Sequence, residues 1–462
     1  MKKLFKTADR KGIRIILDLV AGHTSIEHPW FKKSCEPQKN KYSNWYIWTD
    51  SVWDWSVDRT HAVGYSLLPV LGYSQRDANF LTNYFWFQPA LNYGFAKPDS
   101  HKKWQLPVNH PTVKAVRNEM KRIMRFWLDM GASGFRCDMA GSLIKGDVQW
   151  KQTTELWKDI RGMFDREYPE AAIIAEWFYP PAAIDAMFHL DFVADGKVDK
   201  VPAYSSLFRK EKSRSIMFDR GHSFFDALGR GNIMEFIEIY FRHYNLTKGR
   251  GYISFCSGNH DCPRISIGRS RRELELVFVF LMTMPGVPFI YYGDEIGMRN
   301  LDLPSKEGAF HRTGARTPMQ WNKLKNAGFS TASKNKLYLP IDTRADRPNV
   351  ASQENDPHSL LNHVRRLITL RKQNQCLCAE GDFAPLYAKS NKYPLVYVRR
   401  FGKMKMVIAL NPSQQKVDVN IHCDNIRSNW ALEMGSGVAV QNENCTYRLK
   451  MNGISYGIFC VS

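Results

Sequence analysis

Three carboxylic acids each follow a short apolar segment typical of a β-strand: Asp138, Glu176 and Asp261. Arg136 lies two residues before Asp138, and because side chains alternate between the faces of a strand, the two point the same way. An arginine beside a carboxylate keeps it ionised and fixes its orientation, as a nucleophile requires. A structural ion pair at a strand end is the alternative for this stretch taken alone.

Glu176 has the surroundings expected of a general acid. It follows the apolar residues 171–175 and precedes two aromatic residues, and apolar surroundings raise the pKa of a carboxyl group and keep it protonated. With Asp138 it would form the pair of carboxyl groups, about 5–5.5 Å apart, that cleaves a glycosidic bond with retention. Asp261, which follows His260, would hold sugar hydroxyls in the transition state.

The elements that position these residues alternate between strands and helices. Strands are expected at 13–20, 134–138, 171–175, 186–192, 252–256 and 287–292, and helices at 112–130, 147–167, 232–245, 271–284 and 358–374. Such alternation predicts a parallel sheet, and polar residues at the C-terminal strand ends are typical of a (β/α)8 TIM barrel. An open doubly wound sheet is the alternative, but no glycine-rich phosphate loop supports it.

The predicted barrel is interrupted once and is followed by a different pattern. Residues 25–108 show neither helical nor alternating periodicity and are rich in aromatic residues, so we expect an inserted loop-rich subdomain over residues 22–108. The catalytic barrel would comprise residues 1–21 and 109–375. Short alternating segments then predict a C-terminal antiparallel β-sandwich domain over residues 376–462.

Composition limits the expected partners and location. The 462 residues carry a formal net charge of +20, but the basic residues are spread along the chain, which favours a solvated surface over a nucleic-acid interface. No apolar run is long enough to span a bilayer, so no membrane partner is expected. The cysteines are irregularly spaced and no secretory signal is seen, which predicts a reduced, cytoplasmic location. The oligomeric state is not predicted.

Four segments, in this order, resemble conserved regions of glycoside hydrolase family 13, the α-amylase family. They are residues 18–23, 134–138, 175–177 and 259–261. The resemblance runs from the first strand to the C-terminal domain. It implies that Asp138 is the nucleophile, Glu176 the acid/base, and Asp261 a stabiliser of the transition state.

The same resemblance implies a set of substrate-binding residues. They are His23, Arg136, His260, Arg264 and Asn92. Arg136 would orient the nucleophile, and the two histidines would bind the sugar whose bond is cleaved; a structural histidine at the barrel rim is the alternative for His23. Three further segments resemble the α-glucosidase and trehalose-synthase members of the family: residues 88–92, 291–298 and 316–321. This resemblance implies that Arg264 contacts the terminal glucose.

The chain also departs from the family pattern. Gly22 stands where many members have an asparagine that binds calcium, and Ala90 replaces an aspartate, so no cofactor is expected, with calcium as the alternative. Gly141 and Ser142 replace a lysine and a histidine, which leaves the aglycone subsite unassigned. Family barrels have two strands before residues 13–20, so we expect an N-terminally incomplete barrel.

The activity that the resemblance implies is retaining hydrolysis of α-glucans or short maltooligosaccharides, as part of carbohydrate metabolism. A transglycosylase or isomerase of the trehalose-synthase type would use the same residues and differ in how well water is excluded. A non-catalytic family member is a third alternative. Its usual sign is the loss of a catalytic carboxylate, and all three are present here.

Overall fold

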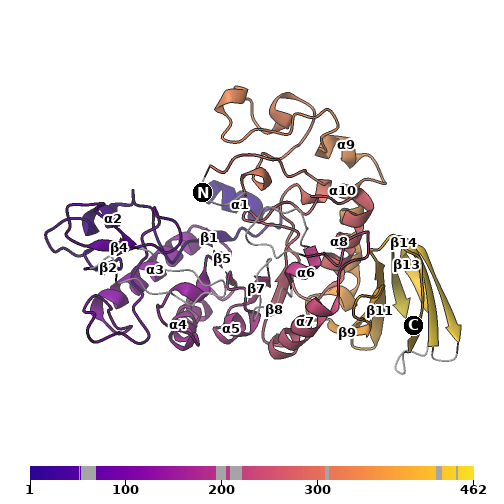
Figure 1. The fold of residues 1–462 in the computed structure, drawn as a ribbon, viewed down its shortest axis with the longest axis horizontal. Coiled ribbons are helices and arrows are strands. Elements are labelled where there is room, and N and C mark those ends of the chain that lie inside the picture. Colours follow the sequence, from indigo (N-terminus) through magenta and orange to yellow (C-terminus); the bar gives the residue numbers. More distant parts are fainter. Residues whose placement is uncertain are drawn as a thin grey trace. The chain divides into compact units, whose positions relative to one another are not determined.

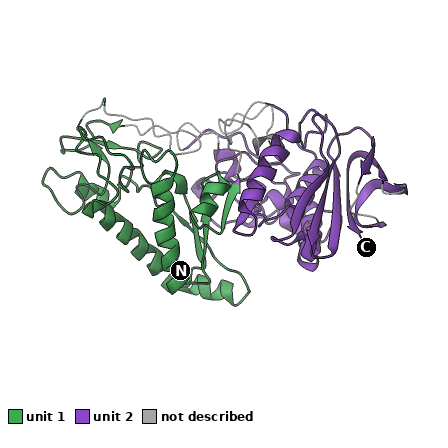
Figure 2. Cartoon of the chain, turned by 90° about the horizontal axis from the view of Figure 1, so that it is seen from below, with its two compact units in different colours: residues 1–192 green, residues 193–462 purple. Residues whose placement is uncertain are grey.

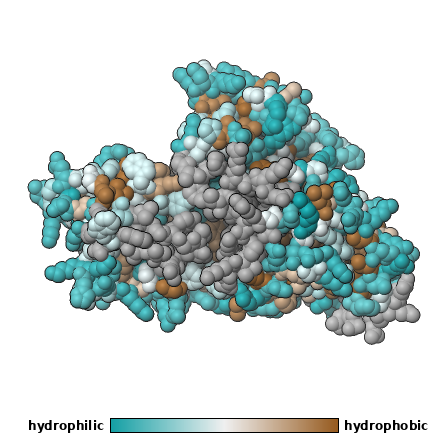
Figure 3. Space-filling model, in the orientation of Figure 1, coloured by the Kyte–Doolittle hydropathy of each residue, from teal (hydrophilic) through white to brown (hydrophobic). Residues whose placement is uncertain are grey.

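A computed structural model describes residues 1–50, 53, 69–193, 204–208, 221–306, 312–422, 429–443 and 446–461. Tertiary contacts divide the chain into two compact units, residues 1–192 (unit 1) and 193–462 (unit 2) (Figure 2). Among the described helices, none has the length and apolar character needed to cross a membrane. The face drawn in Figure 3 is mostly hydrophilic, with small hydrophobic patches.

Unit 1 is built on a parallel sheet. Its strands lie in the order β1 (Leu17–Leu19), β5 (Gly134–Cys137), β6 (Ala172–Ala175) and β7 (Leu190–Val193). Every pairing between them is parallel, so the C-terminal strand ends meet at one edge of the sheet. At the N-terminal ends of β5 and β6, Gly134 allows close pairing, because a Cβ atom on it would lie 2.0 Å from the carbonyl oxygen of Ala172.

The helices of unit 1 include the two predicted at 112–130 and 147–167, which are α3 and α4, and others, most of which the sequence did not predict. They are α1 (Lys2–Asp9), α2 (Pro29–Ser34), α3 (Pro111–Asp129), the 3-10 turn η1 (Ala140–Ser142), α4 (Lys151–Glu167) and α5 (Pro180–Asp185). Helix α3 starts with a proline, whose missing N–H is not needed at the first helical position. Its buried residues recur every three or four positions, from Val113 to Leu128, which is the spacing of one helix face.

The segment predicted as an inserted subdomain shares its core with the sheet of unit 1. It contains a small antiparallel sheet in the order β2 (Trp48–Thr49), β4 (Asn79–Leu81), β3 (Pro69–Val70). Phe31 and Trp45 are buried in the same hydrophobic cluster as Leu19 and Phe135. One core therefore continues across the boundary expected after residue 21, and the domain limits stay a prediction.

Unit 2 begins with one strand and several helices. They are α6 (Ser205–Phe208), α7 (Met234–Thr247), β8 (Tyr252–Phe255), α8 (Arg271–Thr283), α9 (Val350–Glu354) and α10 (Leu360–Gln373). Short 3-10 turns are η2 (Asp294–Ile296), η3 (Thr313–Ala315), η4 (Lys325–Gly328), η5 (Lys334–Lys336) and η6 (Gln375–Leu377). The strand predicted at 287–292 is reduced to a single parallel bridge between Cys256 and Phe289, since Pro288 has no N–H to donate.

The C-terminal part of unit 2 is an antiparallel sheet (yellow in Figure 1). Its strands are β9 (Asp382–Tyr387), β10 (Leu395–Phe401), β11 (Met404–Asn411), β12 (Val417–His422), β13 (Trp430–Glu443) and β14 (Thr446–Val461). All six belong to one hydrogen-bonded sheet, in which β14 pairs with β11, β12 and β13. The predicted antiparallel β-structure at the C-terminal end is confirmed as one sheet, and a separate sandwich domain over residues 376–462 stays a prediction.

Candidate active site

The carboxylates at the strand ends of unit 1 converge on the guanidinium group of Arg136. Its Nη1 lies 2.7 Å from Oδ1 of Asp18 and 2.8 Å from Oδ1 of Asp138, and its Nη2 forms an ion pair with Oε1 of Glu176. Asp18 lies on β1, Arg136 on β5, and the other two follow β5 and β6. One cation thus joins carboxylates from three neighbouring strands.

This cluster is partly shielded from solvent. The side chains of Arg136, Asp138 and Glu176 are 14%, 20% and 9% exposed. Burial lowers the pKa of Arg136, but the charges of Glu176, Asp18 and Asp138 outweigh it and the net shift is upward. The guanidinium group therefore stays charged and holds Asp138 in one orientation, as a nucleophile requires.

Glu176 lies in a more polar setting than the sequence predicted. Its Oε2 accepts a hydrogen bond of 2.9 Å from the backbone N–H of Met139, a residue held in the left-handed region at φ 44°. This bond and the ion pair to Arg136 both favour the ionised carboxylate. The following residue, Trp177, is buried as expected. Glu176 would have to bind a proton to act as a proton donor.

Asp191 on β7 organises the segment that follows Glu176, and the sequence analysis missed it. Its Oδ1 accepts a hydrogen bond of 3.0 Å from the N–H of Trp177, and Oδ2 is buried without a partner among the described residues. Burial raises the pKa of Asp191 to about 8, although backbone donors from Trp177 to Tyr179 oppose the shift. An aspartate inside an apolar strand was the signal that could have revealed it.

His23 lies close enough to Asp138 for their charges to interact. Burial lowers the pKa of His23 to about 4; the charge of Asp138 raises it and that of Lys145 lowers it. The imidazole is therefore neutral at physiological pH, and its Nδ1 lies 3.2 Å from Nδ2 of Asn83. A neutral imidazole is suited to hydrogen-bond sugar hydroxyls.

Lys145 is a buried cation beside this histidine that no motif indicated. Its Nζ donates to Oδ1 of Asn83 at 3.2 Å and to the carbonyl oxygen of Ser142 at 2.6 Å. A Cβ atom on Gly22 would lie 2.9 Å from Nδ2 of Asn83. A calcium ion needs about six to eight oxygen ligands, whereas here glycine offers no side-chain oxygen and the amide oxygen accepts from an ammonium group. These residues do not fit calcium.

The third predicted carboxylate, Asp261, lies in unit 2 among basic side chains. Its Oδ1 forms an ion pair with Nη1 of Arg312 and lies 3.2 Å from Nη2 of Arg316, and its Oδ2 lies 3.2 Å from Nε2 of His260. The N–H of Asp261 donates to Oδ1 of Asn259 at 2.8 Å. The predicted pair of His260 and Asp261 is thus held together with two arginines that the sequence analysis did not assign.

The two remaining predicted substrate contacts are enclosed by protein. Arg264 and Asp294 form an ion pair of 3.1 Å with both side chains fully buried, and the arginine packs on Tyr291 and Tyr292. Asn92 is 2% exposed, and its Oδ1 accepts from the N–H of Gly94 at 3.1 Å. Both therefore support the local backbone, and their contact with substrate stays a prediction.

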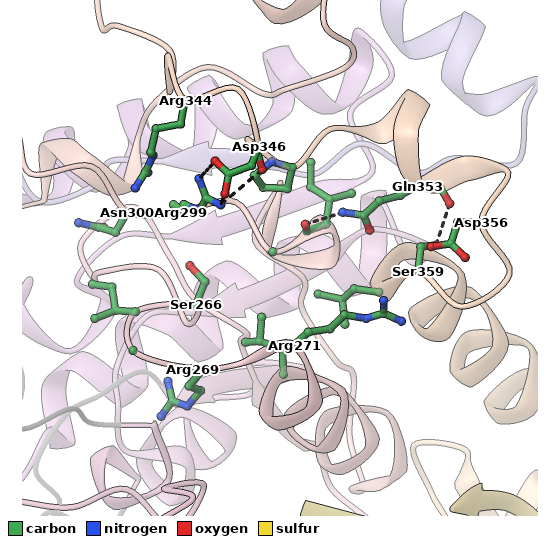
Figure 4. A pocket seen from close by; sticks show the side chains of 17 residues that line it. Ser266, Arg269, Arg271, Arg299, Asn300, Arg344, Asp346, Gln353, Asp356 and Ser359 are labelled. Carbon is green, nitrogen blue, oxygen red and sulfur yellow. Dashed lines mark hydrogen bonds and ion pairs between the residues drawn. The ribbon is translucent and has the colours of Figure 1, made fainter.

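A polar pocket of about 570 Å³ in unit 2 contains four arginines (Figure 4). Each is paired: Arg299 with Asp346 and Arg344 with Asp342, Arg271 with Glu275, and Arg269 with backbone carbonyls. Because protein acceptors hold all four, this pocket is organised as a structural ion-pair network.

Comparison with known proteins assigns the family. The family model described as "Alpha amylase, catalytic domain" matches residues 1–380. The chain belongs to the α-amylase family. Trehalose synthase/amylase TreS of Mycobacterium tuberculosis is 29% identical over 439 residues, which cover 86% of this chain and 66% of TreS. Oligo-1,6-glucosidase of Parageobacillus thermoglucosidasius is 25% identical over 459 residues, which cover 90% of this chain and 77% of that enzyme.

Solved structures agree on the fold. The α-amylase from H. orenii superposes with a TM-score of 0.74 at 22% identity and covers 100% of this chain and 83% of its own. The trehalulose synthase MutB from Pseudomonas mesoacidophila superposes with a TM-score of 0.76 at 20% identity and covers 100% of this chain and 85% of its own. The predicted (β/α)8 fold class is confirmed. The chain spans about two thirds of the length of the mycobacterial relatives.

Proposed function

We propose that this member of the α-amylase family is a retaining α-glycosidase that acts on α-glucans or short maltooligosaccharides. The observation that carries the proposal is the position of Asp138 and Glu176 on the two terminal nitrogens of one guanidinium group. Two carboxyl groups held this closely suit a double displacement, for which the typical separation is about 5–5.5 Å.

In the first step, Oδ of Asp138 attacks the anomeric carbon, and the bond from that carbon to the leaving oxygen breaks. Glu176 gives its proton to the leaving oxygen, so it must first exchange its contact with Arg136 for a proton. Arg136 remains paired with Asp18 and Asp138 and keeps the nucleophile ionised until the ester bond forms.

In the second step, ionised Glu176 takes a proton from water, and the resulting hydroxide attacks the anomeric carbon. The bond to Asp138 then breaks, and the sugar leaves with its original configuration. Asp261, fixed by Arg312 and Arg316 in unit 2, is assigned to the stabilisation of the flattened sugar ring on the basis of its motif.

Transglycosylation is the second candidate function, because trehalose synthases are among the relatives. In that reaction a sugar hydroxyl replaces water in the second step, so the first step and its residues are unchanged. Analysis of the products from maltose separates the two: hydrolysis releases only glucose, whereas isomerisation gives trehalose.

The nucleophile is tested by substitution of Asp138. We expect Asp138→Asn to lose at least about 10³-fold in kcat on maltooligosaccharides, because the ester intermediate cannot form. Asp138→Ala with added azide should convert 4-nitrophenyl α-glucoside into β-glucosyl azide, since azide then attacks from the face that the carboxylate occupied.

Asp159→Asn is the matched control, because Asp159 is an exposed aspartate of the same unit that pairs with Lys121. Its kcat should stay within about twofold of the wild type. Full activity of Asp138→Asn, or an azide product of α configuration, contradicts the assignment of the nucleophile.

A further inference from the structure

A second pocket in unit 2 is lined mainly by aromatic side chains. Its volume is about 410 Å³, within the range of roughly 300–1,000 Å³ usual for ligand sites. Tyr292, Trp321, Phe329 and Tyr338 line it, together with Glu295 and Arg316. We call this set the aromatic pocket. Arg316 and Trp321 belong to the segment 316–321, which resembles the α-glucosidase and trehalose-synthase members. Arg316 holds Asp261 in the proposed mechanism, whereas Trp321 has no role in it.

The aromatic rings of this pocket are exposed to an unusual degree. Trp321 is 49% exposed, Phe329 52% and Tyr338 66%. Many other aromatic rings of unit 2 are buried against one another, as Phe236 is against Phe255 and Phe280. Leaving several large rings in contact with water at one concave site costs hydrophobic free energy, and such grouping is characteristic of a binding site.

The loop that carries two of these rings is held in a fixed shape. Asn326, Ala327 and Gly328 all have positive φ angles of 51°, 56° and 73°, a run that is unfavourable for residues with side chains. The backbone N–H of Trp321 donates to the carbonyl oxygen of Ala327 at 2.9 Å, and that of Phe329 donates to Asn326 at 3.0 Å. The two rings are therefore positioned before any ligand binds.

Polar groups line the same pocket and connect it to Asp261. Nε of Arg316 donates to the carbonyl oxygen of His260 at 2.7 Å, and its Nη2 lies 3.2 Å from Oδ1 of Asp261. Oε2 of Glu295 is buried and has no hydrogen-bond partner among the described residues. A ligand with both an apolar face and hydroxyl groups would match this combination of rings and charges.

We propose that the aromatic pocket is a carbohydrate subsite that binds a glucosyl residue of the substrate other than the one held at Asp261. A pyranose ring presents C–H groups on its faces, which pack on Trp321 and Phe329, and hydroxyls at its rim, which reach Arg316 and Glu295. The neighbouring position of Asp261 makes one oligosaccharide chain the ligand that serves both places. The proposal rests on the proposed function, because it assumes an α-glucan substrate.

The test compares a short and a long substrate in the full chain. We expect Trp321→Ala and Phe329→Ala each to raise KM for maltopentaose by about tenfold, the size expected for the loss of one ring contact. KM and kcat for maltose should stay within about twofold, because maltose does not need an additional subsite. Trp321→Phe, which keeps an aromatic face, should retain most of the affinity.

Phe126→Ala is the matched control, since Phe126 is 54% exposed on α3 of unit 1, outside the aromatic pocket. It should leave both substrates unaffected. An unchanged KM for maltopentaose in both pocket variants overturns the proposal, and so does an equal loss for maltose and maltopentaose. If the wild type cleaves neither sugar, the proposed function fails, and calorimetric titration of maltopentaose still shows whether binding depends on Trp321.

Discussion

Each unit contains an arginine that holds a carboxylate, but the two clusters differ in composition and exposure. Arg136 of unit 1 pairs with three carboxylates and remains 14% exposed. Among the described residues of unit 2, Arg264 forms an ion pair with one carboxylate, Asp294, and neither side chain is exposed. The first cluster presents carboxylate oxygens at the C-terminal edge of the sheet, whereas the second is enclosed by Tyr291 and Tyr292.

This difference indicates two different roles for a pair of arginine and carboxylate, one in a reaction and one in the stability of the fold. A carboxylate that reacts must be reachable by substrate, so its arginine can hold it from one side only. A carboxylate that stabilises a fold can be enclosed, provided that its charge is compensated. Burial raises the pKa of Asp294 to about 6, with the charge of Arg264 opposing the shift, which shows that the compensation is incomplete.

The largest effect on stability is expected at the enclosed pair. Arg264→Met leaves Asp294 buried without its counter-charge and should lower the free energy of unfolding by about 3–5 kcal/mol, measured by urea denaturation. The double variant Arg264→Met with Asp294→Leu should recover most of this loss, because an apolar pair replaces the ion pair. If Arg264 contacts glucose as its motif implies, the double variant will show a strongly raised KM even where its free energy of unfolding is recovered.

The open cluster should respond in activity rather than stability. Arg136→Gln removes the positive charge beside Asp138 and Glu176, so we expect kcat to fall by about 10²-fold, or roughly 2.7 kcal/mol of transition-state stabilisation. The melting temperature should fall less than in Arg264→Met, because Asp18 is 55% exposed and Asp138 20% exposed, whereas Asp294 is fully buried. A variant that unfolds without a specific loss of kcat would place Arg136 with Arg264 as a structural residue.

Local sequence pattern was enough to predict much of the fold and part of the site. The apolar runs before Asp138 and Glu176 are strands β5 and β6, and the spacing of Arg136 and Asp138 on one strand put both on one face. These features depend on neighbours in sequence, where periodicity is informative.

What the sequence could not predict depends on long-range packing. Asp18 meets Arg136 because β1 pairs with β5 in a register that places the two opposite each other, although 118 residues separate them. Burial of Arg264 follows from the packing of two tyrosines that lie in a different segment. Lys145 carries no motif, and only the folded chain shows that its ammonium group lies beside Asn83.

The smallest effect on activity is expected at Asp191, whose Oδ1 accepts a hydrogen bond from the N–H of Trp177, the residue after Glu176. The folded protein raises the pKa of Asp191 from 3.8 to about 8, so between these values the native state binds a proton that the unfolded chain has released. Stability contributed by this protonated group is therefore present at low pH and is lost as the pH rises toward 8. Above that pH the folded protein would hold Asp191 in its charged form without contact with solvent, which is unfavourable.

Asp191→Asn keeps an acceptor for the N–H of Trp177 but cannot ionise. We expect its free energy of unfolding to exceed that of the wild type at pH 8 and to vary less between pH 5 and pH 8. Urea denaturation at several pH values measures both. Identical pH profiles of stability for variant and wild type would mean that Asp191 is ionised in the folded protein. The prediction that a neutral, buried aspartate holds the N–H of Trp177 would then be wrong.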